Sequence, residues 1–543
     1  MDAGAPFVKI VFAALHFGLY RNFESVVLEL ARRGHDVILL ADENESLGGE
    51  QIVAALAAQD ARIRWQWAPS YEQERWFQAA RRLRQGLVYL RFLEPRYAAF
   101  AKLLTRAEER TPRGIVYLSA LPGMRSGHLR RALTRLLEWL DGGMPRLVAM
   151  DAFLSDERPD ALLVASATIP RSPQLDHMRS ARAIGIPTGA CVYSWDHLSS
   201  KGLIRIVPDR VLVWNEVQRR EAIDMHGLPA GRIVVTGAQV YDQWFGRQPS
   251  RTRERFLADA GLPPDRPFLL YVCSALTPDP RESLFVRTWV ESIRASANPE
   301  LRRAGILIRP HPERRPEWDA LDWSDLDHVV ISGRSTPGAV AKADYFDALF
   351  HSTAVVGSVT SAFLEAAVAG RPVLTITPPE LRMHQEGMLH FRYLLEVEDG
   401  LLTVARTLDE HVGHLEALMD GRLEYRERQQ RFLRAFVRPS GLETPATPAF
   451  VEAVEALARE HPAPAADTCT ARQRRAAAWM VQSSERGLMQ MILRDRRDAA
   501  ETATRDERVR AHRRAAAAGR RKHQVKKLVA RIKGAVKRVV GIS

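Results

Sequence analysis

The feature that most restricts the fold is an alternation of short apolar segments with helical patterns, which occurs twice along the 543 residues. Each apolar segment is β-rich and is followed by turn or helix residues. Such an alternation predicts parallel sheets covered by helices. The segments of the first series are 7–15, 35–41, 160–166, 188–194, 209–215 and 232–238.

A second series follows a linker near residue 250, and it indicates a second domain of similar size. Its segments are 268–275, 305–312, 328–333, 348–358 and 371–377. We expect two Rossmann-like domains facing across a cleft, with ligands bound at the carboxyl ends of the strands. The expected boundaries are 1–248 with a helical insertion at about 71–140, 249–440, a linker and helices at 441–504, and a helical basic tail at 505–543.

Charge and cysteine content exclude several classes of protein. Residues 505–543 carry a net charge of +12 out of +13 for the whole chain, so the body is nearly neutral, which argues against a basic nucleic-acid-binding domain. Three widely spaced cysteines exclude a disulfide scaffold or a cysteine-based metal cluster, and they suit a reducing cytoplasm. We expect a cytoplasmic protein.

The most informative segment is residues 355–376, VVGSVTSAFLEAAVAGRPVLTI. An apolar strand ends here, hydroxyl residues follow, and a helix begins, so free backbone N–H groups and the positive end of the helix dipole point outward. Ser358, Thr360 and Ser361 can then donate to phosphate oxygens, and Glu365, one turn later, can accept from ribose hydroxyls. The alternative is that Ser361 only caps the helix while Glu365 faces water.

This segment resembles the nucleotide-binding half of GT-B glycosyltransferases, near the branch of CDP-glycerol glycerophosphotransferases and surface-carbohydrate transferases. Ser358, Thr360, Ser361 and Glu365 match the hydroxyl turn and the Glu that hold a nucleoside diphosphate in that group. The turn itself differs, because glycerophosphotransferases usually have an Asp-Tyr-Ser-Ser type sequence and this chain has GSVTS. The resemblance implies a nucleotide-sugar substrate, no further cofactor and no catalytic metal.

Two more segments agree with the resemblance. In RPHPERR (309–315), the resemblance implies that Arg309 and His311 stabilise the diphosphate leaving group; a solvated basic loop is the alternative. In RIVVTGAQVYD (232–242), Gly237 permits close backbone approach and Asp242 is expected to cap the next helix.

Two residues of the first domain are candidate general bases for an acceptor hydroxyl. His16 lies in the loop after the first strand, where some inverting GT-B enzymes place a histidine, and imidazole can accept a proton at neutral pH. Asp196, in YSWDHLSSKG (193–202), is the rival base. The alternatives are an ordinary polar loop at His16 and a structural loop locked by Trp195.

The end of the chain has the pattern of a basic amphipathic helix. From Val525 to Val540, apolar residues recur every three or four positions and lysines or arginines occupy the other face. Residues 523–543 therefore favour an anionic membrane surface, at the inner face of the plasma membrane. A solvated tail and nucleic-acid binding are the competing interpretations, the latter disfavoured because no aromatic residue interleaves the charges.

Together these features predict a glycosyltransferase of surface-glycan assembly, moving a sugar from a nucleoside diphosphate donor to a glycan or lipid-linked acceptor. Two alternatives remain open. One is transfer of a polyol phosphate from a CDP-linked donor, and the other is a non-catalytic, membrane-associated scaffold with the same fold.

Overall fold

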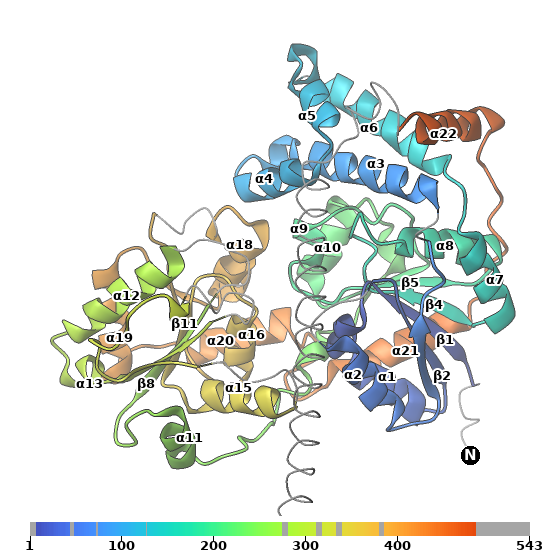
Figure 1. Cartoon of the computed structure of the whole chain (residues 1–543). Coiled ribbons are helices and arrows are strands. Elements are labelled where there is room, and N and C mark those ends of the chain that lie inside the picture. The colour runs from blue at the N-terminus through green and yellow to red at the C-terminus, as the bar shows by residue number, and fades with distance from the viewer. Residues whose placement is uncertain are drawn as a thin grey trace, which may run out of the picture.

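The computed structural model describes residues 7–43, 48–71, 74–125, 127–273, 281–310, 318–332, 339–379 and 385–484. Two parallel sheets, each with helices on both faces, form two domains that face each other (Figure 1). This is the GT-B-like arrangement of Rossmann-like domains expected from the sequence. His311 and the basic tail lie outside the described residues.

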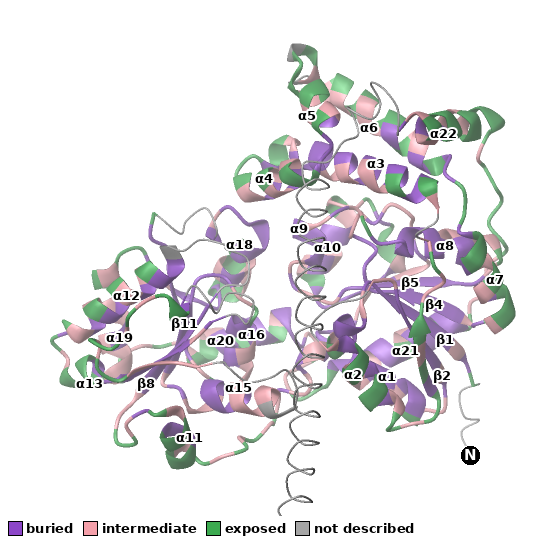
Figure 2. Ribbon diagram, in the orientation of Figure 1, coloured by how far each residue is buried: buried purple, intermediate pink, exposed green. Residues whose placement is uncertain are grey.

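The first sheet has the strand order β3-β2-β1-β4-β5-β6-β7, and every pairing is parallel. Its inner strands are almost wholly buried because helices cover both faces, whereas the edge strand β3 exposes most of its residues (Figure 2). The chain order reverses between β1 and β4, which makes the loops after these two strands the natural ligand-binding edge. The strands are β1 Lys9–Ala14, β2 Asp36–Ala41, β3 Ile63–Trp67, β4 Ala161–Val164, β5 Thr188–Cys191, β6 Arg210–Val213 and β7 Ile233–Val235.

The helices of the first domain include a layer inserted between β3 and β4. The inserted helices lie beyond the carboxyl edge of the sheet and expose much of their surface (Figures 1 and 2). The helices of the first domain are α1 Glu24–Arg32, α2 Gly49–Ala57, α3 Arg75–Phe92, α4 Ala101–Arg110, α5 Arg113–Ala120, α6 Gly127–Gly142, α7 Val148–Glu157, α8 Gln174–Ala183, α9 His197–Ser200 and α10 Glu216–Asp224.

The second sheet has the order β10-β9-β8-β11-β12-β13 and is also parallel throughout. Its order reverses between β8 and β11. The strands are β8 Phe268–Val272, β9 Gly305–Arg309, β10 Val329–Ile331, β11 Ala354–Gly357, β12 Val373–Ile376 and β13 Thr403–Ala405. The helices are α11 Arg253–Ala260, α12 Arg281–Arg294, α13 Pro299–Arg302, α15 Ala339–His351, α16 Ala362–Val368, α18 Leu389–Glu396, α19 Leu408–Met419 and α20 Arg426–Phe436.

The chain returns to the first domain after α20. Helix α21 (Ala446–Ala458) packs on β4, β5 and β6, and Phe450 lies against Phe23 with ring centroids 5.9 Å apart. Helix α22 (Ala471–Ser483) then packs on α3 and α6. The region 441–504, expected as a linker with helices, therefore contributes a core helix to the first domain.

Asp242 corrects one detail of the sequence analysis. It does not cap the next helix in the chain; its carboxylate accepts from the backbone N–H groups of Ala446 and Thr447, at 3.0 and 2.7 Å, and so caps α21. Gly237 makes the expected close approach, since a Cβ there would lie 2.7 Å from the Cβ of Ala446. The segment 232–242 thus anchors the returning helix.

The segment 348–358 is the second correction. It was predicted as one strand, but α15 continues to His351 and β11 begins only at Ala354. The end of the helix is as apolar as the strand, so the run of apolar residues alone does not separate the two.

Candidate functional site

The turn between β11 and α16 presents its hydroxyl groups unequally. Ser358 is buried and its hydroxyl donates to a carboxylate oxygen of Glu282 at 3.3 Å. Thr360 Oγ1 accepts from the N–H of Ala362 at 3.3 Å, whereas Ser361 is exposed and its side chain makes no capping bond. Thr360, not Ser361, therefore caps the helix, and the three hydroxyls do not form one exposed set.

Glu365 lies one turn into α16 and is paired with a tyrosine that the sequence analysis did not single out. The hydroxyl of Tyr345, on α15, donates to Glu365 Oε2 at 2.6 Å. Burial raises the pKa of Glu365 above its ordinary value, and the Tyr345 bond and the charges of Arg21 and Lys342 offset only part of that rise. Such a carboxylate gains from every additional donor, as a pair of ribose hydroxyls would supply.

Arg309 is the last residue of β9, and its side chain contacts α15. Its guanidinium pairs with Asp344 at 2.8 Å and lies over the ring of Tyr345, 5.2 Å from the centroid. Asp344 also pairs with Arg251 at 2.6 Å. Arg309 is therefore positioned to hold Tyr345 against Glu365 by a charge-assisted bond and a cation–π contact.

The first domain adds residues to the same place. Lys342 Nζ on α15 lies 3.2 Å from both carboxylate oxygens of Glu24, the first residue of α1. Arg21 lies in the short 3₁₀ helix Phe17–Asn22 that follows β1 and is exposed. His16 immediately precedes that helix, half-buried at the carboxyl end of β1. The loop after β1 and the helices α15 and α16 therefore meet between the domains.

Asp196 lies at a second contact between the domains. Its carboxylate accepts from Ser194, Ser200 and Lys201 at 2.5, 2.9 and 3.1 Å. Burial alone would raise the pKa of Asp196, but Lys201, His390 and Ser194 together hold it far below the usual range. A carboxylate held ionised in this way is a weak proton acceptor.

The neighbours of Asp196 join the second domain directly. Trp195 packs edge-on against His390 of α18, with ring centroids 4.7 Å apart. Tyr241 is buried within electrostatic range of both Glu365 and Asp196, since burial and these two carboxylates all raise the pKa of its hydroxyl. The two carboxylates therefore belong to one continuous interdomain region, which we call the interdomain site.

Sequence reasoning identified the loops of this site but missed the partner residues on α15. Lys342, Asp344 and Tyr345 precede an apolar run that was interpreted as a strand, so their helical spacing was not considered. Their role depends on contacts with residues 20 to 318 positions away. No group of three His, Cys, Asp or Glu side chains suited to a metal ion is found in the described ranges.

No protein-family model matches the chain, and no curated protein matches it. Solved structures are similar at low identity. The UDP-GlcNAc 2-epimerase from Neisseria meningitidis bound to UDP-GlcNAc is 12% identical, with a TM-score of 0.47 over 82% of this chain and 99% of the other. A glycosyltransferase from Rickettsia africae is 10% identical, with a TM-score of 0.48 over 83% and 99%. WaaG, a glycosyltransferase involved in lipopolysaccharide biosynthesis, is 11% identical, with a TM-score of 0.43 over 83% and 99%.

Proposed function

We propose that the chain is a glycosyltransferase that moves a sugar from a nucleoside diphosphate donor to a surface glycan or a lipid-linked acceptor. The supporting observation is the half-buried Glu365–Tyr345 pair, which lies at the carboxyl edge of the second sheet with Arg21 and Lys342 nearby. A partly desolvated carboxylate beside two cations suits a ligand that carries both ribose hydroxyls and phosphate charge.

Several residues of the interdomain site have a role in this proposal. Glu365 accepts from the ribose hydroxyls, and Arg309 positions Tyr345 against it.

Thr360 and Ser361, at the start of α16, face the diphosphate, with Lys342 and Arg21 supplying positive charge. Ser358 supports the turn through Glu282, and His311 keeps its expected role at the diphosphate.

The chemical step is displacement at the anomeric carbon. A base removes the proton of the acceptor hydroxyl as its oxygen attacks, and the electron pair of the breaking C–O bond leaves with the diphosphate. His16 is the preferred base because an imidazole titrates near neutral pH, at about 6.5. Asp196 is the weaker candidate because its neighbours stabilise the ionised form.

Titration with nucleotides tests the donor site. We expect one of UDP, GDP, CDP and dTDP to bind with micromolar affinity in calorimetry, without a divalent metal and in the presence of EDTA. Glu365→Gln should weaken binding about tenfold to a hundredfold through loss of a charge-assisted bond. Glu254→Gln, on the exposed side of α11, is the matched control and should bind as the wild type does.

The same titration separates the alternatives. Exclusive binding of CDP, with release of CMP from a CDP-linked polyol, would favour polyol-phosphate transfer. If no nucleotide binds and Glu365→Gln keeps full biological activity, the result would favour the non-catalytic scaffold. Release of a nucleoside diphosphate from a nucleotide sugar supports the glycosyltransferase.

We also propose that residues 523–543 hold the protein at an anionic membrane surface. None of the described helices is both long and apolar enough to cross a membrane. In a flotation assay, the full chain should rise with vesicles that contain phosphatidylglycerol, whereas a chain ending at residue 504 should not. Equal flotation of both would contradict this role for the tail.

A further inference from the structure

A pocket of about 460 Å³ opens in the first domain, apart from the Glu365–Tyr345 pair. Its walls come from α3, α4, the loop after β4 and the end of α9. Because β4 borders the point where the strand order reverses, this loop lies at the ligand-binding edge of the sheet. The volume is within the range of about 300–1,000 Å³ that small-molecule sites occupy.

The pocket is strongly basic, and we call it the basic pocket. Among the described residues that line it there are five cationic side chains and no Asp or Glu. The cations are Arg81, Arg106, Arg110, Arg171 and Lys201. A partly enclosed group of like charges favours an anionic ligand because the ligand removes their mutual repulsion.

Two of these cations have no partner within the described part of the chain. Arg171 pairs with Glu43 at 2.7 Å, and Lys201 pairs with Asp196 at 3.1 Å. Arg81 and Arg106 are half-buried, and no ion pair or hydrogen bond of their side chains is found in the described ranges. Arg106 also lies close enough to Lys201 to oppose its protonation.

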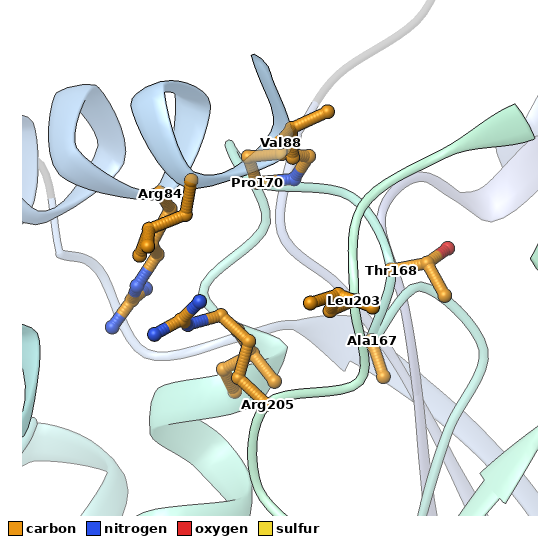
Figure 3. Close-up of a pocket in the computed structure, with 9 residues that line it drawn as sticks. Arg84, Val88, Ala167, Thr168, Pro170, Leu203 and Arg205 are labelled. Atoms are coloured by element: carbon orange, nitrogen blue, oxygen red, sulfur yellow. The ribbon is translucent and has the colours of Figure 1, made fainter. Parts of the chain in front are cut away.

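A neighbouring cavity of this domain contains an arginine that is neutralised by carboxylates. It is small, about 10 Å³, and shares Val88, Thr168 and Pro170 with the basic pocket (Figure 3). Arg84 lines it but is bound by Asp176 at 2.7 Å and by Asp141 at 2.9 Å. Structural arginines here are thus matched by carboxylates, whereas Arg81 and Arg106 are not.

The basic pocket adjoins the interdomain site through Lys201. This lysine lines the pocket and also binds Asp196, a member of the interdomain site. Arg392 of α18 lies over the ring of Phe100, which precedes α4, at 5.8 Å from the centroid. The segment bordering α4 therefore contacts the second domain, and the pocket adjoins the interdomain site at Lys201.

The geometry points to a second binding site, in which Arg81 and Arg106 hold a phosphate or diphosphate group of the acceptor. The apolar side chains of Val88, Phe92 and Leu103 complete the wall and suit the uncharged part of the same molecule. Its assignment to the acceptor rests on the proposed function, but anion binding at the basic pocket does not.

Inorganic pyrophosphate is the probe, titrated into the full chain in the presence of saturating UDP. We expect binding that weakens about tenfold in Arg81→Gln and again in Arg106→Gln, because each loses a charge-assisted bond. Arg106→Lys should retain most of the affinity, and Arg113→Gln, an exposed arginine on α5, should retain all of it. Unchanged melting temperatures would show that each variant folds.

The dependence of pyrophosphate binding on UDP and on the two arginines decides the proposal. Pyrophosphate binding that UDP abolishes, or that Arg81→Gln and Arg106→Gln leave unchanged, would overturn it. Binding that depends on these arginines supports it even if no nucleotide binds, in which case the donor proposal alone fails. Tighter binding of farnesyl diphosphate than of glucose 1-phosphate would indicate a lipid-linked acceptor, and the reverse a soluble sugar phosphate.

Discussion

Tyr345 illustrates how a single hydroxyl prepares a half-buried carboxylate for a ligand. We expect Tyr345→Phe to weaken nucleotide binding about tenfold, because Glu365 loses its one tyrosine donor and its charged form becomes less stable. Calorimetry with the nucleotide that binds the wild type measures this loss. Tyr117→Phe, at an exposed tyrosine on α5, is the control, and an equal loss there would contradict the role of Tyr345.

His411 is a buried imidazole whose effect appears only with pH. Burial lowers its pKa to about 3, so between pH 6.5 and 3 the unfolded chain takes up a proton that the folded chain does not. Stability is therefore lost as the pH falls, by about 3 kcal/mol from this residue between pH 6.5 and 4.5. As the pH falls from 6.5 to 4.5, the free energy of unfolding of His411→Gln, measured with urea, should therefore rise by that amount relative to the wild type.

The exposed His128 provides the comparison for His411. His128→Gln, a change at an exposed histidine on α6, is measured alongside it as the matched control for the substitution itself. If the pH profiles of His411→Gln and the wild type were parallel, the imidazole of His411 would be protonated within the folded domain.

At the scale of elements, the cap on α21 joins distant parts of the chain. Asp242 caps this helix and also pairs with Arg438, at 2.8 Å, whose side chain is only 6% exposed. Asp242→Asn should cost about 2–4 kcal/mol of unfolding free energy, because a largely buried arginine loses its countercharge. Thr252→Ala, which removes an ordinary cap from α11, should cost about 1 kcal/mol or less. Equal effects would argue against the ion pair.

The strands that were missed are also an element-scale result. Neither β3 nor β13 was predicted, and each lies at an edge of its sheet. β3 exposes most of its residues and β13 has only three, so neither gives the continuous apolar run that marks a central strand. The central strands were found from their continuous apolar runs, and so were the edge strands β7 and β10, whose sequences IVV and VVI are wholly apolar.

At the scale of the whole molecule, a hydrogen bond links the domains at a titrating group. Tyr393 of α18 donates to Glu221 of α10 at 2.6 Å, and burial raises the pKa of Glu221 to about 7. Between pH 4.5 and 7 the folded chain holds a proton that the unfolded chain has released, so stability falls as the pH rises. The free energy of unfolding of Glu221→Gln should be about 3 kcal/mol higher than that of the wild type at pH 8 and equal to it near pH 4.5.

Glu216 lies on the same helix and is exposed, which makes it the matched control. Glu216→Gln should show no such gain in thermal unfolding, because the exposed ion pair of Glu216 with Arg219 contributes little to stability. If Glu221→Gln behaved like Glu216→Gln, the carboxyl at this domain contact would be ionised throughout.

The sequence by itself determined the two parallel α/β domains, the helical insertion and the loops in which polar residues follow strands. These features depend on apolar periodicity and local turns, which neighbouring residues fix. Only the tertiary structure decided that Asp242 caps a helix 204 residues away and that Tyr345 serves Glu365. It also decided that Arg81 and Arg106 face one pocket while Arg84 is neutralised. Such pairings leave no local pattern, because folding alone brings their partners within hydrogen-bond distance.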